Sequence, residues 1–474
     1  MPVTTDLITS PELTIRPDVQ VWHRALSSFA LSAEAKRFRE QVGLPTDRPI
    51  VMTGHQAQVW HPGILAKYIA ADVIAQRLGA SAAWVVVDQD TNDPFVVRYP
   101  VVGEDGRTLS ARVWRIDGAE RPWAERYPEV PVGLAPAVSP GVLGDDVARA
   151  GAPHVREGLE AIREAMARHA GASNAARQVG GALTDLLTGV VRTAPTVYAM
   201  ELCRTDLFKA LVEKMRLDAG RCIEAYQRAV RAHPEARVAL LNEGELPLWS
   251  IPEKAGSARK RATVGMLGAG NGGGVSACRF APRALLMTAM LRMAGCELFI
   301  HGLGGAGADG AHGYDAITEM WIKEWLGVKL SPMAVVSATV RLNFDAVGPT
   351  PTPEQIARTR WVAHAARHHP GLLDDGEAEA ARAEAMGVLA RLRWKRDGES
   401  KRVKRAAYRA LQETLAKARV RHAARLKGLE AEAEAAAGRR MEAEIIADRT
   451  WAFPLYEPGQ IAGLREAIGA RLGV

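Results

Sequence analysis

The stretch from Pro49 to Pro94 constrains the fold more than any other part of the chain. A short β-rich run leads through Gly54 into a polar loop, and the residues after it predict a helix from Pro62 to Leu78 that stops at Gly79. A second apolar strand then ends in an acidic run. This order of strand, loop, helix and strand predicts a parallel α/β sheet, in which polar groups that follow neighbouring strands meet at one edge.

Two groups of polar residues therefore predict a ligand site at the carboxyl ends of these strands. The first group surrounds the loop and comprises Thr53, Gly54, His55, Gln56, His61, Gly63 and Lys67. Either histidine is a candidate general base, because imidazole titrates near neutral pH, and a hydrogen-bonded structural histidine is the alternative. Lys67 lies near a helix N-terminus, where a cation is either solvated or placed to meet an anion.

The second group is the acidic run that follows the second strand, namely Asp88, Asp90, Asn92 and Asp93. Its oxygens suit Mg²⁺ or the ammonium group of a substrate. A capped turn is the alternative for Asp93, which precedes Pro94. Asp88 and Asp90 are two residues apart, so on an extended continuation of the strand both would point to one face.

A third candidate segment is CELFIHG, a buried-strand pattern that ends in His301 and Gly302 and continues into a glycine-rich turn with Gly304, Gly305 and Asp309. The glycines indicate either close packing of helix and strand or backbone amides aimed at an anion. If this strand neighbours the first one, His301 faces the same crevice as His55. No acidic residue ends the later strand around Val335, so a dinucleotide site of the usual kind is not predicted.

These motifs resemble those of the BshC family, proposed to be the cysteine ligases of bacillithiol synthesis. TGHQ, then HPG and Lys67, is similar to the TGQQ, GP and Lys pattern that opens that family, and the acidic run is similar to its SEDHD segment. PRALL at Pro282–Leu286 and GLGGAG at Gly302–Gly307 resemble its later segments. The chain departs from the family at His55 and in lacking a closing QER.

The resemblance implies a Rossmann-like core with helical insertions and an antiparallel coiled-coil arm. On this basis residues 1–350 form the core with inserted helices at about 142–232, residues 351–450 form the arm, and residues 451–474 return to the core. It implies a ligase that forms a carbon–nitrogen bond between an amino acid, with cysteine a candidate, and an amino-sugar, or another small-molecule transferase. ATP or another nucleotide, with Mg²⁺, is a candidate cofactor, but there is no Walker motif.

Composition adds the expectation of a soluble cytoplasmic protein with a small-molecule substrate and no membrane partner. The chain has 474 residues, 47% of them hydrophobic and 24% charged, and contains no apolar run long enough to cross a membrane. The cysteines at 203, 222, 278 and 296 form no C-x-x-C pair, so we expect them to be buried and reduced. No protein metal site is predicted, because the histidines near His368 lack further ligands.

The remaining pattern is mostly helical. A hairpin is predicted around the Glu-Asp-Gly turn at 104–106, a helix at Asp206–Ala232, and a very long helix from about 399 to Arg449. Tyr408, Leu411, Leu415, Ala418, His422, Leu426, Leu429 and Ala433 recur at the spacing of a helix-pairing seam, through which two copies could dimerise. The same helix is basic, so an RNA-associated or scaffold protein is the alternative function, although a solvated face is the preferred interpretation and nucleic acid is not expected.

Overall fold

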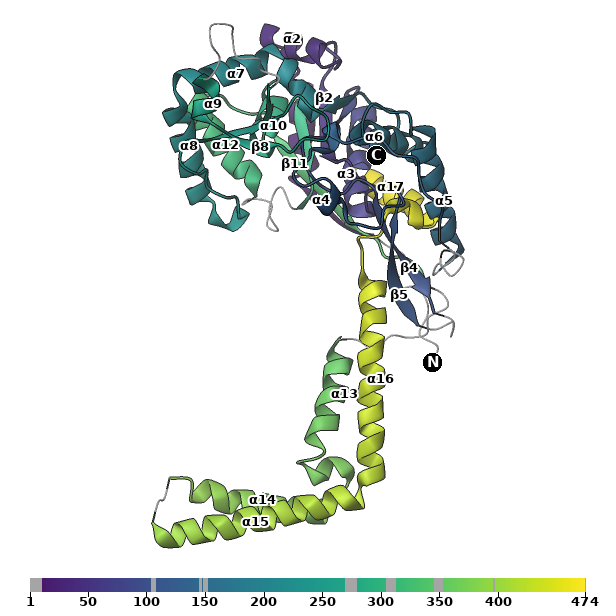
Figure 1. The fold of residues 1–474 in the computed structure, drawn as a ribbon, viewed down its shortest axis with the longest axis vertical. Helices are drawn as coiled ribbons and strands as arrows, with labels where there is room; N and C mark the ends of the chain where they lie inside the picture. Colours follow the sequence, from purple (N-terminus) through teal and green to yellow (C-terminus); the bar gives the residue numbers. More distant parts are fainter. Residues whose placement is uncertain are drawn as a thin grey trace. The chain divides into compact units, whose positions relative to one another are not determined.

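A computed structural model describes residues 11–103, 108–144, 147, 152–268, 279–303, 313–344, 353–394 and 397–473. The chain divides into two compact units (Figure 1). The larger contains residues 1–101, 111–343 and 448–474, and the smaller contains residues 102–110 and 344–447. Cys203, Cys222 and Cys296 are buried, as expected from the sequence.

A six-stranded, mainly parallel sheet forms the centre of the larger unit. The order across the sheet is β1 (Glu12–Arg16), β11 (Met333–Thr339), β10 (Leu298–His301), β2 (Ile50–Gln56), β3 (Ser81–Val87) and β6 (Thr196–Tyr198). Only β1, at one edge, is antiparallel to its neighbour. From β2 the chain proceeds to β3 and β6 on one side, and β10 and β11 later fill the other side. Ligands of open parallel sheets bind at such a reversal of strand order.

Helix α3 (Pro62–Arg77) covers one face of this sheet. Every residue from Pro62 to Ala75 is buried, which is the condition of a helix enclosed on nearly all sides. It packs against β2, β3 and β11 and, elsewhere on its surface, against the C-terminal helix α17 (Pro458–Leu472). Its sequence signals are confirmed, because Pro62 opens the helix and Gly79 follows it with φ of +63°.

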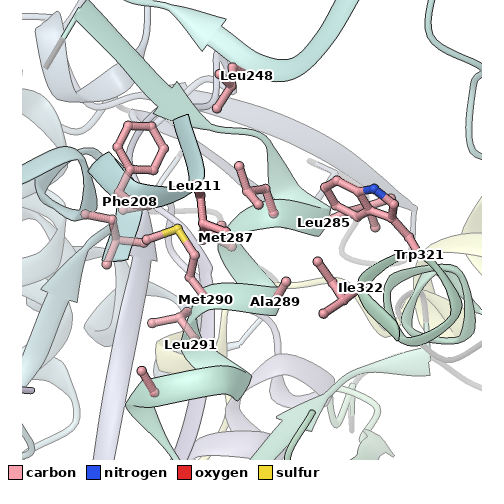
Figure 2. Close-up of a cluster of buried hydrophobic side chains, with 14 of the residues drawn as sticks. Phe208, Leu211, Leu248, Leu285, Met287, Ala289, Met290, Leu291, Trp321 and Ile322 are labelled. Carbon is pink, nitrogen blue, oxygen red and sulfur yellow. The ribbon is translucent and has the colours of Figure 1, made fainter. Parts of the chain in front are cut away.

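The opposite face of the sheet packs on a large apolar cluster (Figure 2). Met52, Val85 and Phe299 point into it from the strands. The helices that complete it are α2 (Ala33–Gln41), α7 (Asp206–Leu217), α8 (Ala219–Ala232), α10 (Ala284–Met290) and α12 (Tyr314–Leu326). The larger unit is therefore a mixed α/β structure with helices on both faces of a mainly parallel sheet.

Several further elements lie outside the main sheet. The predicted hairpin is confirmed as β4 (Val96–Val102) and β5 (Leu109–Arg115). Two helices follow, α5 (Pro153–Arg168) and α6 (Ala175–Leu186), and a second small sheet has the order β8 (Lys260–Thr263), β7 (Glu245–Ser250) and β9 (Phe280–Pro282). Short 3-10 turns at Val132–Leu134 and Ala199–Arg204 connect these parts.

One predicted helix of the larger unit is two helices. The sequence predicted a continuous helix from Asp206 to Ala232, but the chain leaves the helical conformation at Asp218. There the Asp218 side chain accepts a hydrogen bond from the Arg221 backbone amide and caps α8. A residue that can cap a new helix competes with continuation of the old one, and apolar spacing alone does not reveal it.

The smaller unit is mostly helical and contains two helix pairs. Helix α13 (Pro353–Ala365) packs on α16 (Ala423–Ala447), and α14 (Gly376–Arg391) packs on α15 (Gly398–Arg421) (Figure 1). The prediction of one unbroken helix was wrong, because it breaks at His422, whose Nε2 lies 2.9 Å from Asp375 Oδ2. Tyr408 was also misplaced in the seam, since it is 55% exposed.

Among the helices of the described ranges, none combines the length and apolar character that crossing a membrane requires.

The fold explains one glycine of the TGHQ motif in steric terms. A Cβ on Gly54 would lie 2.2 Å from Val85 Cγ1 and 2.3 Å from the Val85 carbonyl oxygen, both on the adjacent strand. We therefore expect Gly54→Ala to lower the free energy of unfolding by about 1–3 kcal/mol or more, the usual cost of overpacking. Urea unfolding measures it. Gly171→Ala is the matched control, because a Cβ there meets nothing within 4 Å; equal losses in the two variants would contradict this account.

Candidate functional site

The TGHQ residues lie at the carboxyl end of β2, and most of them have structural partners. Thr53 Oγ1 donates to the Ile300 carbonyl oxygen at 2.8 Å, which links β2 to β10. Gln56 Nε2 donates to Asp90 Oδ2 at 3.2 Å. His61 Nδ1 accepts the Gly63 amide at 3.1 Å and so caps α3. The loop is consequently a well-connected turn between a strand and a helix.

Lys67 is buried with only 4% of its surface exposed, so the alternative of a solvated lysine is wrong. Its Nζ donates to the Gly54 carbonyl oxygen at 2.7 Å. Burial lowers the pKa of Lys67 to about 7. A buried amine that is partly charged at neutral pH, next to the N-terminus of α3, has the properties of a group that meets an anion.

The two histidines of the loop differ from the prediction of bases that titrate near neutral pH. Burial lowers the pKa of His55 to about 3, and the Lys67 charge adds to that effect. Burial lowers the pKa of His61 to about 4, with further contributions from Arg449 and Lys67. Both imidazoles are therefore neutral at physiological pH. Nδ1 of His55 is buried and has no hydrogen-bond partner among the described residues.

His301 does not face the same crevice as His55, contrary to the prediction. Strand β10 does lie beside β2, but Ile300 pairs with Thr53, so alternation along the strands puts His301 and His55 on opposite faces of the sheet. His301 instead contacts the start of α12. Its Nδ1 lies 3.2 Å from the Tyr314 hydroxyl and its Nε2 lies 3.2 Å from Asp315 Oδ1. The buried guanidinium of Arg292 also approaches Asp315, at 3.5 Å.

The acidic run separates into structural residues and one residue that lines a cavity. Strand β3 ends at Val87 and the chain then turns, so Asp88 and Asp90 do not share a face as predicted. Asp90 binds Gln56 and Arg259. Asn92 Nδ2 donates to the Ala57 carbonyl oxygen at 2.9 Å. Asp93 accepts the Phe95 amide and pairs with Arg115, as the turn alternative predicts.

Asp88 is the member of the run that lines a cavity. The cavity has a volume of about 370 Å³ and lies where β3 and β6 end. Asp88 Oδ1 accepts the Met200 amide at 2.8 Å, and no hydrogen bond to its Oδ2 occurs among the described residues. Burial raises the pKa of Asp88 to about 7, while the amide of Met200 opposes the shift. The carboxyl can therefore take up or release a proton near neutral pH.

Charged groups of both signs surround the same cavity. Arg177, in the first turn of α6, stacks 3.8 Å from the centre of the Tyr198 ring and forms an ion pair with Glu201. The two charged side chains keep 41% and 38% of their surface exposed, so a ligand can reach both. The apolar part of the lining includes Leu134, Ile251 and Phe280. This mixture suits a small molecule with an amine and an acid group.

The sequence analysis did not identify Arg177, Tyr198 or Glu201. Tyr198 ends β6 and Glu201 follows it, but this strand of three residues is too short to give a recognisable alternation. A signal was present in the run TVYAMELC, where apolar residues after Pro195 lead into an acidic residue. The rule that polar groups after parallel strands converge would have placed Glu201 beside Asp88 once that strand was recognised.

Some predicted site residues cannot be placed. Gly302 follows β10, close to the Lys67 side chain, whereas Gly304, Gly305 and Asp309 lie outside the described residues. Within the described ranges, no three His, Cys, Asp or Glu side chains gather as a metal ion requires.

Comparison with known proteins returned no matching family model and no matching curated protein. Among solved structures, a tyrosyl-tRNA synthetase from Archaeoglobus fulgidus, complexed with L-tyrosine, is similar to this chain. The similarity covers 85% of this chain and 99% of the synthetase chain. The two chains are 11% identical and the TM-score is 0.24. Such a TM-score supports no argument about the fold or the function of this chain.

The raised pKa of Asp88 leads to a test by protein stability. Between pH about 4 and pH about 7 the folded chain holds a proton on Asp88 that the unfolded chain has lost, so stability falls as the pH rises through that window. Asp88→Asn removes the effect, and its oxygen can still accept the Met200 amide. We expect the variant to become more stable than the wild type as the pH rises from 5 to 8.

Thermal unfolding across this pH range measures the effect. Asp47→Asn is the control, because Asp47 is exposed and its pKa is lowered by the side chain of Arg48. A constant difference between the wild type and Asp88→Asn at every pH would show that Asp88 is not a buried, proton-binding carboxyl.

Proposed function

We propose that this chain is a BshC-like ligase that joins an amino acid, with cysteine the first candidate, to an amino-sugar or a related amine. The observation that carries the proposal is the cavity at the ends of β3 and β6, where Asp88, Arg177 and Glu201 meet. Support also comes from the motif resemblance in β2 and α3, which form the neighbouring part of the same sheet edge. The proposal includes a Rossmann-like core that binds a nucleotide.

The cavity has separate positions for the two charged ends of an amino acid. Arg177 is a guanidinium with donors that can hold a carboxylate in two parallel hydrogen bonds. Glu201, beside it, is an acceptor for an ammonium group. The N-terminus of α6 adds partial positive charge on the Arg177 side. A volume of about 370 Å³ is within the range of small-molecule sites.

Asp88 is the residue proposed to act on the attacking amine. Amide formation breaks a bond from the acyl carbon to oxygen, forms the bond to nitrogen, and requires the nitrogen to lose a proton. A carboxyl whose pKa is near 7 accepts that proton more readily than an ordinary aspartate does. A nucleoside triphosphate is the proposed energy source, through transfer of a phosphoryl or nucleotidyl group to the acid.

Lys67 is proposed to contact an anionic group at the start of α3, such as a phosphate of that nucleotide. It lies beside Gly54 at the reversal of strand order, and its charge is available at neutral pH and below. His55 and His61 are neutral there, so they are proposed as hydrogen-bonding residues instead of general bases.

The smaller unit has a separate place in the proposal. We propose that it is the coiled-coil arm that the motif resemblance implies, and that two copies dimerise through it. Light scattering of the full chain at several concentrations tests the second point.

The activity is tested by mass spectrometry of mixtures that contain the protein, ATP, Mg²⁺, glucosamine and one of the twenty amino acids. We expect an amide product whose mass is the sum of the two substrates less water. Asp88→Asn should lower kcat by about 10²-fold or more, the usual contribution of a general base, with KM nearly unchanged. Arg177→Gln should raise KM.

Asp47→Asn, an exposed aspartate that lines no part of the cavity, is the matched control and should keep full activity. Isothermal titration of the wild type with each amino acid gives a second measurement that does not require turnover. Full activity of Asp88→Asn, or no amino acid bound by the folded wild type, would refute the proposal.

A further inference from the structure

The end of the α14–α15 helix pair carries exposed cations and exposed aromatic rings whose role the packing does not explain. Leu411 and Leu415 of α15 pack against Ala385 and Leu389 of α14, so the apolar face of α15 is already covered. Its opposite face and the end of α14 are polar and solvated. We call the following residues the basic tip: Trp394, Lys401, Arg402, Arg405, Tyr408 and Arg409.

The cations of the basic tip differ from other cations of the smaller unit in their ion pairing. In the part of the chain that the structure describes, Lys401, Arg402, Arg405 and Arg409 form no ion pair, whereas Arg421 and Arg425 near the helix break bind Asp375 and Asp374. Helix α15 contains eight Lys and Arg and only two Glu, against a net charge of +7 for the whole chain. Like charges three and four residues apart on a helix repel one another. Binding of a polyanion would relieve this repulsion.

Two aromatic rings of this region are exposed, and the guanidinium of Arg393 lies 5.1 Å from the centre of the Trp394 ring. The Trp394 side chain is 82% exposed and Tyr408 is 55% exposed. Neither ring is therefore buried in the apolar contacts between the helices. Tyr408 is one helical turn from both Arg405 and Lys404 and almost two turns from Lys401. Lys401, Arg405 and Arg409 form a row with a rise of about 6 Å per step.

Aromatic rings within a row of cations are the features that bind single-stranded nucleic acid. Bases stack on the exposed rings, and the backbone phosphates pair with the cations. Insertion of an amphipathic helix into a membrane surface requires an apolar helix face, and here that face is covered by α14. A two-fold contact between the basic tips of two copies would place cations against cations.

We propose that the basic tip binds single-stranded RNA, with phosphates held by Arg402, Arg405 and Arg409 and with bases stacked on Trp394 and Tyr408. This binding is independent of the ligase proposed above, because every residue it uses belongs to the smaller unit. It assigns the smaller unit a role as an RNA-binding module.

Fluorescence anisotropy of a labelled 20-nucleotide poly(U), titrated with the full chain at several salt concentrations, tests the proposal. We expect the logarithm of affinity to fall linearly with the logarithm of salt. The triple variant Arg402→Gln, Arg405→Gln, Arg409→Gln should make that slope shallower by about 2, because each contact to a single strand contributes about 0.7. Trp394→Ala should lower affinity about fivefold to a hundredfold without changing the slope.

The matched control is the triple variant Lys209→Gln, Lys214→Gln, Arg231→Gln, which removes the same charge from exposed positions of α7 and α8 in the larger unit. It should bind poly(U) like the wild type. An equal loss in both triple variants would refute a localised site and indicate general attraction of a polyanion to a basic protein. Circular dichroism of each variant confirms that the helices are retained.

Three further titrations decide which class of partner the basic tip binds. Duplex RNA, single-stranded DNA and vesicles of phosphatidylcholine and phosphatidylserine are titrated under the same conditions. Stronger binding to vesicles than to poly(U), or no binding of poly(U) at 150 mM salt, would overturn the proposal. So would a dimer in light scattering that the basic-tip triple variant alone converts to a monomer, because the tip would then be a contact between copies.

Discussion

The burial of α3 on nearly all sides is the constraint on which the larger unit depends. A helix enclosed in this way leaves no solvent for its polar side chains, so each must find a partner inside the protein. Lys67 donates to the Gly54 carbonyl oxygen. Asp72 forms ion pairs with Arg192 and with Arg465 of α17. Lys67 and Asp72 of α3 therefore join the sheet, the segment before β6 and the C-terminal helix.

The same burial determines the electrostatics near the sheet edge. From the residue types alone, the histidines, the lysine and the carboxylates near this edge would be expected to have their usual pKa values. Desolvation instead makes His55 and His61 neutral and brings the pKa values of Lys67 and Asp88 to about 7, from opposite directions. Two groups of opposite kind that titrate near neutrality at the ends of neighbouring strands are a feature of reactive sites more than of structural ones.

Local signals in the sequence predicted the local structure well. Pro62 and Gly79 marked α3, and the parallel pairing of β2 with β3 followed from the strand–helix–strand order. Features that depend on distant partners could not be predicted in this way. The break at His422 arises from Asp375 on another helix, and the opposite orientations of His301 and His55 arise from the register of two strands that are far apart in sequence.

The candidate site was predicted only in part for a related reason. Asp88 was named because it follows a strong strand, but its partners Arg177 and Glu201 follow weak or unrelated signals and meet it only through the fold. The acidic run also contained three residues with structural partners: Asp90 accepts from Gln56, Asn92 donates to the Ala57 carbonyl oxygen, and Asp93 accepts the Phe95 amide. A sequence pattern does not distinguish a carboxylate that holds a turn together from one that faces a cavity.

The packing of α17 on α3 has a consequence for synthesis of the chain. The ribosome makes α3 before α17, and the smaller unit is made between them. Until α17 emerges, the surface of α3 that it will cover is exposed, and Asp72 lacks Arg465. The nascent chain therefore carries an open apolar surface while all the residues between these two helices are made, the kind of surface that chaperones bind and that favours aggregation when elongation stalls.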